Sequence, residues 1–122
     1  MRLWMLIAGS TVSVAIGAGD LSAQEGGQYD DLLIEALEAA ADQSCPEDIM
    51  SPMLLDACEQ QMPRMGQQIA SLGPIQRVRY RGTQSSQMGP VEVYSVEFRR
   101  GRMTWMINTG SDGKILVLWS PG

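Results

Sequence analysis

The hydrophobic period of the chain changes once, at Pro74, and this change limits the folds that the chain can adopt. Residues 30–43 place apolar side chains at helical spacing, with no proline or glycine among them. From residue 75 to residue 119, apolar side chains recur at every second position in four runs separated by turn residues. This order predicts the α+β class, with N-terminal helices packed on a four-stranded antiparallel sheet.

Two further stretches before Pro74 have helical spacing. The first covers residues 50–58, and we expect its helix to start at Ser51-Pro52. The second covers residues 65–72 and ends at Gly73. Proline lacks a backbone N–H, and its ring clashes with the preceding helical turn. We therefore expect Pro63 to interrupt the helical layer between these two stretches.

The alternation of the strands predicts one sheet face that packs on the helices. This face carries Gln76, Val78, Tyr80, Tyr94, Val96, Phe98, Met103, Trp105, Ile107, Ile115, Val117 and Trp119. The opposite face carries Arg77, Arg79, Arg81, Val93, Ser95, Glu97, Arg102, Thr104, Met106, Leu116 and Leu118. Because Leu116 and Leu118 are apolar on that second face, we expect the fourth strand to be buried on both sides or to lie at an interface.

Residues 1–23 have the layout of a secretory signal peptide. Arg2 precedes an apolar run, and Leu21-Ser22-Ala23 forms a cleavage site before Gln24. The apolar run is shorter than the ~20 residues that a spanning helix needs. We expect a flexible lead-in over residues 24–29 and a single domain over residues 30–122. The expected location is periplasmic or secreted, with no membrane span after cleavage.

The two cysteines, Cys45 and Cys58, both lie after this leader. In an oxidising compartment, an even number of cysteines usually indicates a disulfide. A redox or metal role is the alternative, but the spacing is not C-x-x-C and the chain has no histidine to complete a zinc site. The sequence therefore favours a structural Cys45–Cys58 disulfide.

Charge is divided between the two parts of the chain. Residues 24–63 contain ten acids and no base, whereas residues 64–122 contain eight bases and three acids. The arginines of this second part could form a basic strip. Two solvated faces of opposite sign would explain the pattern, and so would a face that steers a charged partner. Nucleic acid is not expected, because the chain carries an export leader, its formal net charge is −5, and no aromatic ladder interleaves the arginines.

No catalytic motif is convincing. The absence of histidine excludes Ser-His-Asp and Cys-His systems. Ser111 and Lys114 match the S-x-x-K pattern, but they lie in an Asp-Gly turn rather than at a helix start. We assign no acid to the sheet face of Tyr80 and Tyr94, so no acid–base site is predicted there. The chain is expected to be non-catalytic and to need no cofactor.

Two binding functions are alternatives. A small-ligand carrier would use a cup between helices and sheet, lined by Tyr80, Tyr94, Phe98, Trp105 and Trp119. A periplasmic copper handler would use methionine thioethers, which are soft Cu(I) ligands. Of the three M-x-x-M pairs, Met50 and Met53 could share a helix face. Methionine as adaptable core filler explains the same pattern.

The segments 93–105 and 112–119, with Leu72-Gly73-Pro74-Ile75 upstream, have a recognisable pattern. A Val-Tyr-x-Val-x-Phe strand leads through a turn to a strand with Trp105, and Asp-Gly-Lys-Ile then leads to a strand that ends in Trp119. Over residues 65–120 this pattern resembles small cystatin-like, NTF2-like modules of secreted bacterial proteins. Such modules occur alone or beside serine hydrolases of the penicillin-binding and β-lactamase-like kind, so the resemblance implies an α+β fold and an envelope partner.

We therefore expect an exported interaction module that uses its exposed sheet face. Its partner would be a second copy of the chain or an envelope protein such as a serine hydrolase. The expected contact residues are Arg77, Arg79, Arg81, Met106 and Leu118.

Overall fold

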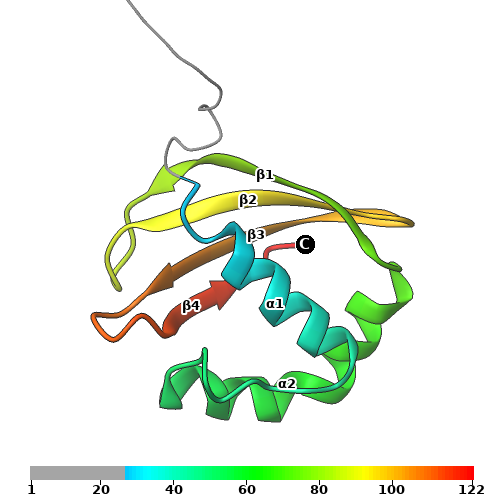
Figure 1. Cartoon of the computed structure of the whole chain (residues 1–122), viewed down its shortest axis with the longest axis horizontal. Helices are drawn as coiled ribbons and strands as arrows, with labels where there is room; N and C mark the ends of the chain where they lie inside the picture. The colour runs from blue at the N-terminus through cyan, green and yellow to red at the C-terminus, as the bar shows by residue number, and fades with distance from the viewer. Residues whose placement is uncertain (1–26) are drawn as a thin grey trace, which may run out of the picture.

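The α+β prediction is confirmed. In the computed structural model, which describes residues 27–122, two helices pack against one face of a four-stranded antiparallel sheet (Figure 1). The elements are α1 (Asp30–Ala41), α2 (Pro52–Ser71), β1 (Ile75–Gln84), β2 (Val91–Phe98), β3 (Gly101–Thr109) and β4 (Ile115–Trp119). The predicted signal peptide lies outside the described residues. Among residues 27–122, no helix is long and apolar enough to cross a membrane.

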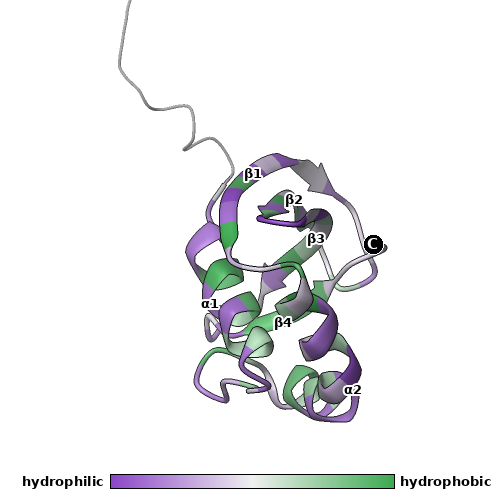
Figure 2. Cartoon of the chain, turned by 90° about the vertical axis from the view of Figure 1, so that its right-hand side faces the viewer, coloured by the Kyte–Doolittle hydropathy of each residue, from purple (hydrophilic) through white to green (hydrophobic). Residues whose placement is uncertain are grey.

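The sheet is a simple meander. Its strand order is β1-β2-β3-β4, and each strand pairs antiparallel with the next. Seen from the side, apolar segments of α1 and α2 lie beside the apolar strand β4, below β1, β2 and β3 (Figure 2). This arrangement leaves β1 and β4 as the two sheet edges.

The core lies between the helices and the sheet. Leu33 and Leu37 of α1 and Ile69 of α2 are at most 2% exposed, and they pack with the buried side chains of the strands. Trp105 at the centre of β3 is the largest fully buried side chain. Burial of each such side chain contributes roughly 1.5–3 kcal/mol, so this layer fixes which sheet face meets the helices.

The expected break at Pro63 is wrong, because α2 continues through it. A proline at this position leaves the carbonyl of Glu59, four residues earlier, without its helical donor. Glu59 and Pro63 are both exposed, so water can satisfy that carbonyl. Met62 and Ile69 bury one face of α2 on either side of Pro63, and this packing keeps the helix continuous.

The predicted helix start at Ser51 is confirmed. The Ser51 hydroxyl accepts a hydrogen bond from the backbone N–H of Leu54 at 3.3 Å, and Pro52 occupies the first helical position. Just before this cap, the backbone N–H of Ser51 donates to the carbonyl of Ile115 at 2.9 Å, and that of Ile115 donates to the carbonyl of Ile49 at 2.7 Å. Residues 49–51 therefore cover the start of the β4 edge.

The face assignment of β4 is wrong for its second half. A register shift in β3–β4 pairing separates Asn108↔Val117 from Thr109↔Ile115, which gives β4 one extra residue. Such a bulge moves the following side chains to the opposite faces. Leu118 therefore packs against the core, whereas Trp119 is 56% exposed on the other side.

Candidate functional site

The sheet face that points away from the helices is the first candidate site, and we call it the outer face. The strand registers place Val93, Met106 and Trp119 opposite one another on β2, β3 and β4. These three residues form an apolar row across the outer face. Exposure increases along the row, because Val93 is buried, Met106 is half-buried and Trp119 is exposed.

Polar and charged rows lie beside the apolar row. Arg79, Ser95 and Thr104 are paired across β1, β2 and β3, and Arg77, Glu97 and Arg102 form the next row. The structure thus brings together the predicted contact residues Arg77, Arg79 and Met106. Arg81 is exposed at a register shift of β1.

Leu118 is the predicted contact residue that the structure removes from this face, and Trp119 takes its place. A bulge of one residue cannot be read from hydrophobic alternation alone. The Asp-Gly turn chemistry predicted the hairpin but not the shift in pairing that follows it.

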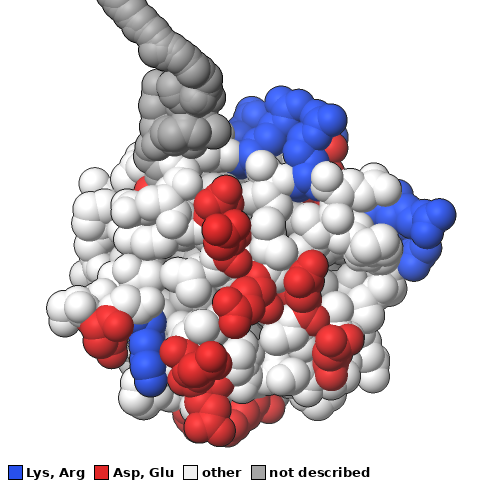
Figure 3. All heavy atoms as spheres, in the orientation of Figure 1, with Lys and Arg blue, Asp and Glu red and all other residues white. Residues whose placement is uncertain are grey.

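The charges of the two layers are separate in space. Acidic side chains spread over the face formed by α1 and α2, while most basic ones gather over β1 and at the right-hand end of the molecule, apart from one basic group at the lower left (Figure 3). Within residues 27–122, the only ion pair is Arg77 Nε to Glu97 Oε1 at 4.0 Å, and both side chains are exposed. Exposed pairs contribute at most about 1 kcal/mol. The remaining arginines of the outer face are therefore available to a partner.

A buried carboxylate lies on the helix-facing side of β2, which corrects the expectation that no acid accompanies the tyrosines there. Glu92 is 5% exposed and its Oε1 accepts a hydrogen bond from the Tyr94 hydroxyl at 2.5 Å. Burial, reinforced by this hydrogen bond to Glu92, raises the pKa of Tyr94 well above its usual value. Two-residue spacing on a strand places Glu92 and Tyr94 on one face, and this signal could have found the pair.

The Glu92–Tyr94 pair holds the segment before α1. The backbone N–H and side-chain amide of Gln28 donate to the two oxygens of Glu92 at 3.1 and 3.2 Å, and the backbone N–H of Tyr29 donates to the Tyr94 hydroxyl at 3.0 Å. These hydrogen bonds anchor Gln28 and Tyr29, the last two residues of the predicted lead-in, to β2. These hydrogen bonds give the pair a structural role.

Most of the predicted ligand cup is filled by core packing, although Phe98 also lines an open hollow with Leu37 and Ile75. Tyr80, Tyr94, Phe98 and Trp105 do face the helices, and the rings of Tyr80 and Tyr94 meet edge to face with centroids 5.8 Å apart. Trp119 does not belong to this group. Tyr94, Phe98 and Trp105 are at most 5% exposed and contact other core side chains.

A cavity of about 70 Å³ lies nearby, between α1, α2 and the sheet, and we call it the interhelix cavity. Trp105 is the only predicted cup residue on its wall. Its lining is Ala36, Leu37, Ala40, Met50, Leu54, Ala57, Cys58, Gln61, Met62, Met65, Ile69, Trp105 and Leu118.

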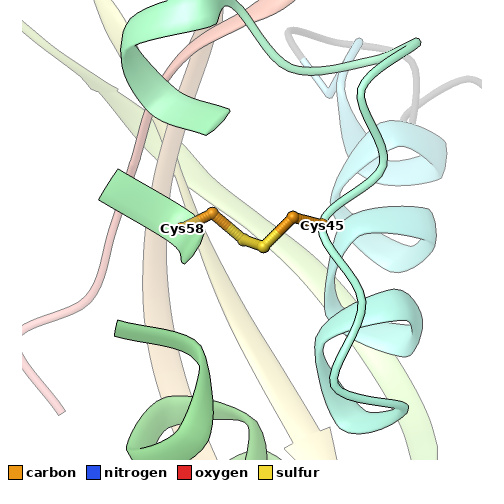
Figure 4. The surroundings of a disulfide bond; sticks show 2 residues. All are labelled: Cys45 and Cys58. Atoms are coloured by element: carbon orange, nitrogen blue, oxygen red, sulfur yellow. A yellow bond between two sulfur atoms is a disulfide. The ribbon is translucent and has the colours of Figure 1, made fainter. Parts of the chain in front are cut away.

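The sulfur-containing residues divide into two groups. Cys45, after α1, and Cys58, in α2, form the predicted disulfide (Figure 4). Met50 is 3% exposed before the cap of α2, whereas Met53 is 61% exposed in its first turn. The expected face shared by Met50 and Met53 is therefore wrong, because Met50 precedes the helix.

The S-x-x-K residues lie in the turn between β3 and β4. The backbone N–H of Lys114 donates to Asp112 Oδ1 at 3.0 Å, and that of Gly113 donates to the carbonyl of Gly110 at 3.0 Å. These are the hydrogen bonds of an Asp-Gly turn, as the sequence predicts.

Comparison with known proteins gives no relative: no family model, no curated protein and no solved structure matches the chain.

Proposed function

We propose that the protein is an exported, non-catalytic interaction module that binds an acidic protein surface through its outer face. The observation that carries this proposal is the row Val93–Met106–Trp119 beside the arginine-bearing rows of β1. Both helices pack on the opposite side of the sheet. The outer face thus carries an exposed tryptophan at its β4 edge and arginines toward its β1 edge, and both residue types are enriched at the energetic centres of protein interfaces.

Both sheet edges are poorly suited to pairing with a strand of a partner, which supports contact through the outer face instead. The β1 edge contains Arg77, Arg79 and Arg81 and two register shifts, and charges and bulges of this kind discourage edge-to-edge pairing. At the other edge, residues 49–51 cover the start of β4. A partner would therefore meet side chains of the outer face.

The disulfide supports the proposed periplasmic or secreted location, since such bonds persist in oxidising compartments. The resemblance to cystatin-like and NTF2-like modules makes an envelope protein, such as a serine hydrolase, the partner to test first. The separation of basic and acidic patches supports an acidic docking surface on that partner.

Site-specific photo-crosslinking in the cells that produce the protein tests this proposal. A benzophenone amino acid replaces Trp119 in one variant and the equally exposed Met53 of α2 in a matched control. We expect a discrete adduct from position 119 that is lost when Arg79→Glu is added, and none from position 53. Equal adducts from both positions, or none from position 119, would contradict the proposal.

The same experiment separates the two kinds of partner. An adduct of twice the chain mass, together with a mass in solution that rises with concentration, would identify a second copy of the chain. An adduct with an acidic envelope protein would identify a heterologous partner. The proposal predicts the second result.

A further inference from the structure

The interhelix cavity is separate from the outer face and is almost wholly apolar. Of its lining side chains, only Gln61 and the indole of Trp105 carry polar atoms that can form ordinary hydrogen bonds. Apolar cavities in proteins stay dry and take up apolar molecules, and one of ~150 Å³ accepts benzene. At about 70 Å³, this cavity fits a narrower group, such as the end of an unbranched alkyl chain.

The wall of the cavity can adapt to such a chain. Met50, Met62 and Met65 contribute three thioether side chains to the lining. Methionine is unbranched with three rotatable bonds, so it adjusts to occupants of different length. Rotamer changes of these side chains can therefore adapt the wall to the occupant.

The entrance to the cavity limits the head group of its ligand. Gln61 is exposed and lines the cavity, so it marks the rim, and its amide can both donate and accept hydrogen bonds. Arg64, three residues further along α2, is also exposed and lines a surface hollow together with Gln61. The donors of these two side chains favour a head group that accepts hydrogen bonds.

We propose that the interhelix cavity binds the end of an unbranched alkyl chain whose head group accepts hydrogen bonds. This inference is independent of the proposed partner, because it uses no residue of the outer face. A soft cation is the less favoured occupant. Although three thioethers line the cavity, no carboxylate or thiolate lines it to balance a buried positive charge.

Trp105 supplies the readout. It lines the cavity, and its Nε1 is buried without a hydrogen-bond partner among residues 27–122. Two-dimensional NMR of the oxidised protein would follow the Trp105 Nε1–H resonance, assigned with the variant Trp119→Phe. We expect a saturable shift on addition of 1-hexanol. Its branched isomer 3,3-dimethyl-1-butanol should give none, because its tert-butyl end is too wide for a cavity of about 70 Å³.

Two substitutions on α2 locate the binding site. Ala57→Leu fills the cavity and should abolish the response to 1-hexanol, while Ala70→Leu, on an exposed position of α2, should leave it unchanged. No saturable response in the unmodified protein, or an equal response to both ligands, would overturn the proposal even if Ala57→Leu fails to fold. A saturable response to Ag(I) without one to 1-hexanol would assign a soft-metal site instead and also overturn it.

Discussion

Gly66 lies where α2 comes closest to the end of α1. A Cβ at this position would lie 2.6 Å from the carbonyl oxygen of Ala40 and 2.9 Å from the Met62 sulfur. The carbonyl can move only if α1 moves. Gly66→Ala should therefore lower the free energy of unfolding by about 1–3 kcal/mol, although alanine normally favours a helix.

The urea unfolding midpoint measures this effect. Ala70→Gly, on an exposed position of the same helix, is the control and should cost about 1 kcal/mol through helix propensity alone. A midpoint for Gly66→Ala equal to or above that of the unmodified protein would show that the helices are not in close contact.

Tyr94 makes the free energy of unfolding depend on pH in the alkaline range. Its pKa is raised in the folded protein, chiefly by burial, while in the unfolded chain it is near 10. The unfolded chain therefore loses this proton first, and stability falls as the pH rises above about 10. Tyr94 alone contributes a slope of up to about 1.4 kcal/mol per pH unit there.

Urea unfolding at pH 8, 10 and 11 would measure this dependence. Tyr94→Phe should flatten the alkaline slope, while Tyr80→Phe, with a tyrosine hydroxyl that bonds the exposed Thr83, serves as the control. An alkaline slope unchanged by Tyr94→Phe would refute the assignment to Tyr94.

The disulfide joins the loop after α1 to the second turn of α2. Cys45 and Cys58 are 13 residues apart, and closing a loop of this size stabilises the folded state by about 3 kcal/mol in the chain-entropy account. We expect the double variant Cys45→Ala/Cys58→Ala to lose about that much in urea unfolding. A midpoint that matches the oxidised protein would show that the bond contributes little.

At the scale of elements, hydrophobic period predicted the class, the four strands and the first helix, because burial of one face dominates each of these. It was wrong at Pro63 and Leu118. At Pro63, packing of Met62 and Ile69 overrides a local rule, and at Leu118 a bulge in β3–β4 pairing overrides alternation. Both effects depend on contacts between elements, which a local pattern does not contain. The two-residue spacing of Glu92 and Tyr94 could have predicted that they share a sheet face. The hydrogen bonds of Glu92 to Gln28 could not be predicted, because they join distant parts of the sequence.

Across the whole molecule, acidic repulsion in the helical layer is not balanced by internal ion pairs among the described residues. Asp31 and Glu35, four apart on α1, and Glu35 and Glu38, three apart, are like-charge pairs that each cost about 0.2–0.5 kcal/mol at low salt. Salt screens such repulsion. The melting temperature should therefore rise between 10 and ~150 mM NaCl, and a fall would indicate stabilising ion pairs instead.

The central claim is that the outer face forms an interface with Trp119 as its anchor. The most direct test is calorimetric titration of the partner captured by crosslinking, with the unmodified protein, Trp119→Ala and Met53→Ala measured side by side. We predict at least about tenfold weaker binding for Trp119→Ala and no change beyond about twofold for Met53→Ala. Equal affinities for the three proteins would contradict the claim.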